Sequence, residues 1–325
     1  MDSGNIGFVL LCAAFVFVMT PGLAMFYGGL VRKKNVVNTM MTSIFIIGIG
    51  IVMWVLFGYS LSFAPSGNAF IGDFRWLGLE GVSLTEGYTD DASIPNMVFS
   101  AFQMMFAVIT PALITGAVAG RMKFKSIFVF TIFWSLIVYY PLAHMVWGQG
   151  GLLGADGIGA LDFAGGDVVH ISSGVSALVL CILLGKRHDY EHSIYRIHNI
   201  PTVVLGASLL MFGWFGFNAG SALAADGLAA HAFMTTGVSA AAAMLSWMLC
   251  DVVKNKKPTL IGASTGMVAG LVGITPGAGF VPMWAAVIIG LTTSPVCYIM
   301  ISYGKKKFGF DDALDAFSCH GTGGI

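Results

Sequence analysis

The chain has 325 residues, of which 57% are hydrophobic and only 10% charged, and its formal net charge is zero. Its mean hydropathy is +0.84. Because so little polar surface cannot cover a water-soluble globule of this length, the composition excludes a soluble domain and indicates an integral membrane protein.

Apolar segments follow one another along the whole chain, and we predict ten helical spans from them. Crossing a bilayer takes roughly 20 apolar residues. The predicted spans lie near residues 6–30, 40–63, 95–119, 126–147, 164–185, 200–223, 229–252, 259–275, 281–303 and 311 to 325.

Lysine and arginine fall almost entirely in alternate loops. Fifteen of the sixteen follow the first, third, fifth, seventh or ninth segment, and Arg75 is the exception. Since loops rich in lysine and arginine stay in the cytoplasm, these five loops are predicted to be cytoplasmic and the N-terminus to face outside.

Two loops and the cysteines allow more than one interpretation. The outward loop 64–94 is acidic; it either concentrates cations or, more simply, is a solvated loop. In the loop 186–199, solvation of His188, His192 and His198 is favoured over zinc binding. The five cysteines lie in apolar segments without metal-ligand spacing, so we expect no metal and no cofactor.

Two histidines, His170 and His320, lie in otherwise apolar segments. An ionisable side chain at this depth is costly and suggests a functional site, although a histidine bonded to a neighbouring helix is the plainer alternative. An aspartate precedes each by eight residues, Asp162 and Asp312. Matched histidines favour two inverted five-helix repeats, residues 1–187 and 200–325, joined by a cytoplasmic linker at 188–199.

Aromatic side chains gather at the predicted outer ends of the third, fourth and sixth segments. They are Phe102, Phe106, Trp147, Trp214 and Phe217, with the hydroxyl of Ser221 beside them. Singly, such aromatics are usually packing or interface residues. Together, aromatic faces and one hydroxyl are the chemistry that holds a small cation by cation–π contacts.

Six motifs spread along nearly the whole chain carry a family resemblance. They are FYGGLVRKKN at 26–35, AHMVWG at 143–148, DFAGGDVVHISSG at 162–174, WFGFNAGSA at 214–222, TPGAG at 275–279 and DALDAFSCHGTGGI at 312–325. The chain resembles the ammonium transporter family, the Amt/Mep branch of the Amt/Mep/Rh superfamily. Residues 162–187 match the long signature of that family in spacing.

The resemblance implies two functions for the outer aromatic residues. Trp147, Phe106 and Ser221 resemble the outer site that recruits ammonium. Phe106 and Phe217 resemble the stacked phenylalanine gate that closes the outer vestibule.

The resemblance also implies a pore and an assembly. His170 and His320 resemble the twin histidines of the narrow pore, and Asp162, Phe102 and Trp214 resemble residues that support these sites. Members of the family are plasma-membrane homotrimers with one pore per subunit, and many are blocked from the cytoplasm by a PII-type regulatory protein.

We therefore predict an all-α polytopic protein that captures NH4+, removes a proton, and conducts NH3 past the twin histidines with a proton relay. A bare cation in a low-dielectric pore loses solvation worth tens of kcal/mol, whereas neutral ammonia does not. Because burial disfavours a charged imidazole, the two histidines are expected to be neutral and hydrogen-bonded to each other. No nucleophile with a base or phosphate loop supports an enzyme, and no nucleic-acid partner is expected.

Two alternative functions are weighed against this one. An Amt-like sensor domain, which binds ammonium without transporting it, would keep the same residues and differ mainly in a C-terminal output domain. A neutral-gas channel of the Rh type is disfavoured because Trp147 and Ser221 suit the capture of a cation.

The C-terminal end departs from the family pattern of eleven helices. A helix from Asp311 to Ile325 would rise only about 22 Å, which is short of a full crossing. A fragment that ends inside the tenth helix is favoured over a variant built on ten spans.

Overall fold

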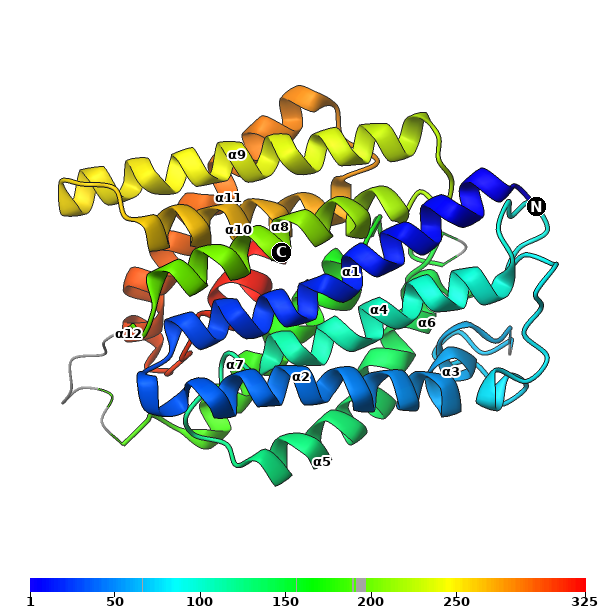
Figure 1. Cartoon of the computed structure of the whole chain (residues 1–325), viewed down its shortest axis with the longest axis horizontal. Coiled ribbons are helices and arrows are strands. Elements are labelled where there is room, and N and C mark those ends of the chain that lie inside the picture. Colours follow the sequence, from blue (N-terminus) through cyan, green and yellow to red (C-terminus); the bar gives the residue numbers. More distant parts are fainter. Residues whose placement is uncertain (66, 156, 189, 191–196) are drawn as a thin grey trace.

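The computed structural model describes residues 1–65, 67–155, 157–188, 190 and 197–325, and within them every regular element is helical (Figure 1). Nine helical stretches among these residues are long and apolar enough to cross a membrane. The predicted all-α, multi-span class is therefore confirmed.

These nine stretches follow the first nine predicted spans closely. They are Ser3–Leu30 (α1); Lys33–Phe63, which contains α2 (Val36–Met53) and α3 (Tyr59–Phe63); Asn96–Ile114 (α4); Phe124–Trp147, which contains α5 (Phe124–Trp134) and α6 (Tyr140–Trp147); Gly166–Leu184, which ends in α7 (Ser172–Leu184); Ile200–Gly220 (α8); Gly227–Asn255 (α9); Leu260–Gly277, which begins with α10 (Leu260–Ile274); and Met283–Phe308, which contains α11 (Met283–Ile299) and α12 (Lys305–Phe308).

The tenth predicted segment is helical over a shorter range than its apolar pattern suggests. A π-helical turn spans Phe317–Gly321 and is followed by α13 (Thr322–Gly324). The preceding residues form a loop, because the carboxylate of Asp312 accepts the backbone N–H of Ala316 at 2.9 Å and Asp315 has a left-handed backbone with φ of 63°.

Polar side chains begin several of the helices by accepting otherwise unpaired backbone N–H groups. Asp226 accepts from Ala229 at 3.0 Å to start α9, and Thr259 accepts from Gly262 at 2.9 Å to start α10. Asn199 caps α8, whose first turn contains a proline. These caps fix where the chain re-enters the bundle after each loop.

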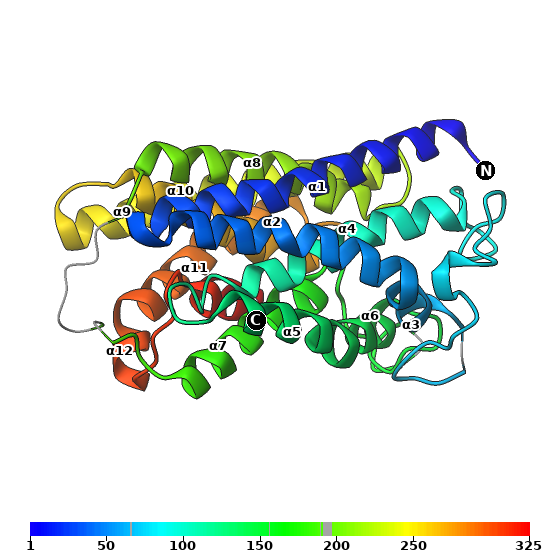
Figure 2. The same cartoon turned by 60° about the horizontal axis from the view of Figure 1, so that its bottom comes forward.

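The helices run roughly along the long axis of the molecule, and two views agree on which ends meet (Figures 1 and 2). The N-terminus and α3 lie at one end, which we call the outer end, following the charge pattern. The last turns of α1 and α9 and the whole of α12 lie at the opposite end, here called the inner end. The C-terminus lies inside the bundle, midway along the helices.

Small residues allow close helix packing in the centre of this bundle. The contact between α1 and α8 shows this: a Cβ atom on Gly206 would lie 2.2 Å from the backbone nitrogen of Phe26. The two backbones therefore touch directly, and a larger side chain at Gly206 would separate the helices.

Aromatic stacking holds the outer loop onto the helices. Tyr59 stacks on Trp76 with ring centroids 5.4 Å apart, and Tyr88 stacks on Phe99 at 4.7 Å. The hydroxyl of Tyr59 also donates to the side-chain oxygen of Asn96. The described part of the loop is thus fixed over the start of α4.

Candidate functional site

A single carboxylate starts the helix that carries His170. The Asp162 oxygens accept the backbone N–H groups of Gly165 (2.6 Å), Gly166 (2.7 Å), Asp167 (2.8 Å) and Val168 (3.1 Å). Burial raises the pKa of the Asp162 carboxyl, and hydrogen bonds from the backbone oppose that rise. Asp162 therefore acts on helix geometry, because its oxygens are already occupied.

The segment that carries His320 is built in a similar way. Asp312 accepts the backbone N–H of Ala316 at 2.9 Å and that of Ser318 at 3.1 Å. Both histidines lie on π-helical turns, one over Gly166–Ile171 and one over Phe317–Gly321. Such turns are rare and often occur at functional sites, since the extra residue redirects a side chain.

The two histidines meet in the middle of the bundle. Their Nδ1 atoms are 3.3 Å apart, and their rings lie nearly parallel with centroids separated by 5.2 Å. One Nδ1 must carry the hydrogen and the other must accept it, so this contact requires that the rings are not both protonated. Among the described residues, His170 Nε2 is buried without a hydrogen-bond partner.

Two glycines make this contact possible. A Cβ atom on Gly174 would lie 2.1 Å from the backbone nitrogen of Gly321 and 2.4 Å from its Cα. The helical segments that carry the histidines therefore pack backbone against backbone, which brings the imidazoles within hydrogen-bonding distance.

Aromatic rings continue from the histidines toward the outer end. His170 stacks on Phe217 with centroids 6.0 Å apart, Phe217 lies 4.3 Å from Phe106, and Phe106 meets Trp147 edge-on at 6.0 Å. The structure thus brings Phe106, Trp147, Phe217, His170 and His320 into one continuous column.

Trp214 and Phe102 flank this column. Trp214 stacks on His170 with centroids 5.2 Å apart, and its Nε1 donates to the hydroxyl of Thr275 at 2.8 Å. Phe102 contacts Phe106 edge-on at 4.9 Å. Both side chains are buried, so they fix the positions of rings in the column.

The Phe106–Phe217 contact separates two cavities. An outer cavity of about 430 Å³ is lined by Phe106, Trp147 and Ser221. An inner cavity of about 180 Å³ is lined by Phe217, His170 and His320. The side chains of Phe106 and Phe217 are 1% and 0% exposed, so the two rings form a closed wall between the cavities.

Hydrogen bonds fix two polar groups at the outer cavity. Ser221 Oγ donates to the carbonyl of Phe217 at 2.9 Å, so its single hydrogen is used and its lone pairs remain as acceptors. Trp147 Nε1 donates to the carbonyl of Asp162 at 3.0 Å, which orients the indole ring. The cavity wall therefore combines a hydrogen-bond acceptor with aromatic surface.

Comparison with known proteins identifies the family. The family model described as Ammonium Transporter Family matches residues 7–325. The chain belongs to the ammonium transporter family. An ammonium transporter of Bacillus subtilis (strain 168) is 53% identical over 324 residues, which cover 100% of this chain and 78% of that protein. An ammonium transporter of Aquifex aeolicus is 46% identical and is covered over 75% of its length.

Solved structures agree with this membership of the ammonium transporter family. Mep2 of Saccharomyces cerevisiae superimposes with a TM-score of 0.91 at 39% identity, over 100% of this chain and 72% of that one. A structure described as Sensor Amt Protein gives a TM-score of 0.89 at 29% identity, over 99% of this chain and 80% of that one. The chain is thus a multi-pass membrane protein of a family of transporters, which agrees with the prediction that it is not an enzyme.

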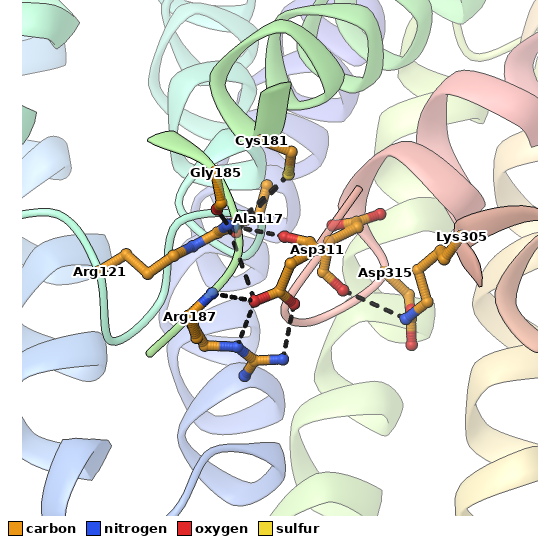
Figure 3. A network of polar contacts seen from close by, with 9 residues as sticks. Ala117, Arg121, Cys181, Gly185, Arg187, Lys305, Asp311 and Asp315 are labelled. Atoms are coloured by element: carbon orange, nitrogen blue, oxygen red, sulfur yellow. Dashed lines mark hydrogen bonds and ion pairs between the residues drawn. The ribbon is translucent and has the colours of Figure 1, made fainter. Parts of the chain in front are cut away.

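A charged cluster at the inner end of this family member anchors the His320 segment (Figure 3). Asp311 accepts from Arg187 through Nε at 2.7 Å and through a terminal guanidinium nitrogen at 2.8 Å. Arg121 donates to the carbonyls of Ala117, Gly185 and Asp311. The cluster therefore ties the chain after α4 and the end of α7 to the start of the last segment.

Several residues at the two cavities were not singled out from the sequence. Tyr88, Asp91 and Gln103 line the outer cavity, and Tyr27 and Asp315 line the inner one. Gln103 had a usable signal, since it is a polar residue three positions before Phe106 in an apolar helix. The others lie in loops or belong to a different helix, and only the fold brings them to the cavities.

The structure shows no metal site in the part of the chain that it describes. No group of three or more His, Cys, Asp or Glu side chains there is arranged to hold a metal ion. His192 and most of the predicted linker 188–199 lie outside the described residues, so the linker remains a prediction.

Proposed function

We propose that the protein transports ammonium by binding NH4+ in the outer cavity, removing a proton, and passing NH3 between the two halves of the chain. Trp147, Phe106 and Ser221 form the recruitment site in this proposal. The observation that carries it is the contact between His170 and His320, directly below the closed aromatic wall.

The chemistry of the two cavities supports deprotonation between them. The outer cavity offers aromatic faces and the lone pairs of Ser221, which suit a cation that donates N–H bonds. The inner cavity is apolar apart from a few side chains, and an unpaired charge there would lose solvation worth tens of kcal/mol. Neutral ammonia avoids this cost, so ammonium must give up its proton where it reaches the histidine pair and does not cross the inner cavity as a cation.

The histidine pair supplies a path for that proton. Dissociation of NH4+ gives NH3 and one H+, and His170 Nε2 is a buried nitrogen that has no partner among the described residues. A proton taken up by one ring is released from the other through the shared Nδ1 contact, which returns both rings to the neutral state. Potassium cannot follow this route because it has no proton to give.

The larger assembly completes the proposal. We infer two inverted repeats, residues 1–187 and 200–325, with the N-terminus outside and the histidines at the interface between repeats. Homotrimers in the plasma membrane, with a PII-type protein as a cytoplasmic regulator, are what family membership suggests for this chain.

An ammonium sensor that binds without transport is the second candidate. The likeness to the structure described as Sensor Amt Protein favours it, because that fold matches over nearly the whole chain. Binding in the outer cavity would be the same in both cases, so only flux distinguishes a transporter from a sensor.

The test measures ammonium uptake and current in proteoliposomes made from the purified protein. We expect saturable uptake that is lost in His170→Ala and His320→Ala, whereas His170→Glu loses less because a carboxylate still exchanges protons. His231, which bonds to the carbonyl of Val281 away from the column, provides the control His231→Ala.

Two results would contradict the proposal. Wild-type selectivity against potassium in both alanine variants would show that the histidines are structural. Ammonium binding without any flux in the unmodified protein would favour the sensor.

A further inference from the structure

The turn that follows α10 carries the TPGAG motif at 275–279 and contacts the column of rings from the side. It is a 3₁₀ turn over Thr275–Gly277. Thr275 is buried, and its hydroxyl donates to the carbonyl of Leu271 at 2.7 Å and accepts from Trp214 Nε1 at 2.8 Å. Because a hydroxyl has a single hydrogen, the bond to Leu271 leaves only lone pairs for the indole. Thr275 is therefore fixed as the acceptor of the Trp214 N–H.

Trp214 in turn restrains the ring of His170. The two rings stack with centroids 5.2 Å apart and an interplanar angle of 24°, and the indole is only 1% exposed. Within the described part of the chain, the His170 side chain has one hydrogen-bonding contact, between its Nδ1 and that of His320. The terminal torsion of a histidine is broad, so one such contact does not fix the tilt of the imidazole. The stacked indole provides the missing restraint.

The same turn also holds the backbone that carries His170. The backbone N–H of Phe163 donates to the carbonyl of Pro276 at 3.0 Å. A Cβ atom on Gly166 would lie 2.4 Å from the Cβ of Pro276, so the proline packs directly on the first residue of the π-helical turn. Two adjacent residues of one short turn thus contact the backbone before His170 and, through Trp214, its ring. The position of the imidazole relative to its own backbone is set by this turn.

We infer that Thr275 is a positioning residue for the proton step: by accepting the indole N–H it holds Trp214 against His170, which keeps the imidazole aligned with that of His320. The inference rests on the proposed function, because this alignment matters only if the two imidazoles pass a proton. Without the hydroxyl, the buried indole N–H loses its acceptor, which is costly enough to turn the ring toward another one. Neither Thr275 nor Trp214 is among the described residues that line the outer cavity, so capture of the cation does not depend on this bond.

The experiment removes the hydroxyl and keeps the shape of the side chain. Thr275→Val has nearly the same volume without a hydroxyl, and Thr275→Ser keeps the hydroxyl. Thr42→Val is the control, because the buried Thr42 of α2 also donates its hydroxyl to a carbonyl four residues earlier, that of Asn38 at 2.8 Å. Thr42 is not one of the described residues that line either cavity. Ammonium uptake into proteoliposomes is measured over a range of concentrations and divided by the amount of folded protein.

We expect maximal uptake per folded molecule to fall about ten-fold in Thr275→Val, because a misplaced proton acceptor slows the transfer steeply. The ammonium concentration for half-maximal uptake should stay at the wild-type value, because the outer cavity is intact. Thr275→Ser should restore most of the uptake, and Thr42→Val should match the wild type. A half-maximal concentration that rises while maximal uptake is retained would overturn the inference.

A double substitution tests whether Thr275 acts through the indole N–H. Trp214→Phe keeps an aromatic ring but has no N–H to donate, so it should lower maximal uptake on its own. Adding Thr275→Val to Trp214→Phe should then have no further effect, because the bond is already absent. If the two effects multiply instead, Thr275 supports the protein independently of Trp214 and the inference is overturned.

The variant His170→Ala separates this inference from the proposed function. If uptake is lost in His170→Ala but Thr275→Val keeps the wild-type maximal rate, the assignment of Thr275 is overturned and the proposed function stands. If His170→Ala also transports ammonium normally, the histidines are structural and both proposals are overturned.

Discussion

Replacing Gly174 by alanine tests whether the histidine contact depends on backbone packing. The new Cβ would lie 2.1 Å from the backbone nitrogen of Gly321, and contacts shorter than 3.0 Å are essentially never seen for Cβ atoms. The two segments must therefore separate by about 1 Å. That shift moves the Nδ1 atoms from 3.3 Å to about 4 Å, beyond hydrogen-bonding distance.

The expected cost of Gly174→Ala follows from two effects. Overpacking a tight contact costs about 1 to 3 kcal/mol, and the lost hydrogen bond costs about 0.5 to 1.5 kcal/mol. Alanine favours a helix over glycine by about 1 kcal/mol, so the net destabilisation is about 0.5 to 3.5 kcal/mol. We expect earlier thermal unfolding in detergent and loss of ammonium uptake in proteoliposomes.

Gly48→Ala provides the control for this experiment. Gly48 is an exposed residue of α2, and a Cβ there would have no neighbour within 4 Å. The control gains the same helix preference without a clash, so it should be neutral or slightly stabilising. If Gly174→Ala unfolds at the same temperature as Gly48→Ala and transports ammonium normally, the packing argument is wrong.

Three further predictions concern the outer cavity, the aromatic wall and the inner charged cluster. Trp147→Leu removes a cation–π contact worth about 0.5 to 2 kcal/mol and should raise the ammonium concentration for half-maximal uptake more than it lowers maximal flux; an unchanged half-maximal concentration would contradict the recruitment site. Phe217→Ala should join the two cavities and admit other cations, measured as potassium current, and folded protein with unchanged selectivity would argue against a gate. Asp311→Asn removes the buried carboxylate that faces the Arg121 and Arg187 side chains, which are only 7% and 13% exposed, and should cost about 3 to 5 kcal/mol in thermal or denaturant unfolding. Asp73→Asn, which removes an exposed pair with Arg75, should have no measurable effect; equal effects would show that burial of the cluster is unimportant.

The transmembrane fold was predictable because lipid imposes strict requirements on sequence. Backbone groups in hydrocarbon must be bonded within a helix, so each crossing appears as a long apolar segment. Nine predicted spans correspond to helices whose ends differ by a few residues, as at Ser3–Leu30 and Asn96–Ile114. The exception follows Asp311, where the left-handed backbone of Asp315 ends a short loop and Asp312 accepts the N–H groups of Ala316 and Ser318, so the helix begins later than the apolar pattern alone suggests.

The candidate site was predictable where a residue is costly in its own segment. His170 and His320 stand out because an ionisable group in an apolar helix needs a reason, and motif resemblance added Phe106, Trp147, Phe217 and Ser221. Their arrangement in one column is a geometric observation, and their functions remain predictions.

Other features depend on contacts between distant segments and leave no local pattern. Arg121 and Asp311 are 190 positions apart in the sequence, and each resembles an ordinary charged residue at a helix end. Residues of this kind are found only when the packing of the whole chain is known.

The separation of the two histidines along the chain has a consequence for biosynthesis. Their contact joins residues 150 positions apart. At about 5 to 20 residues per second, the ribosome makes His320 about 8 to 30 s after His170. During this interval the imidazole of His170 and the facing surface of Gly174 have no partner from the last segment. The part of the protein made first must therefore keep this polar surface shielded by water, lipid headgroups or the insertion machinery, and the histidine contact forms only when the segment that carries His320 arrives.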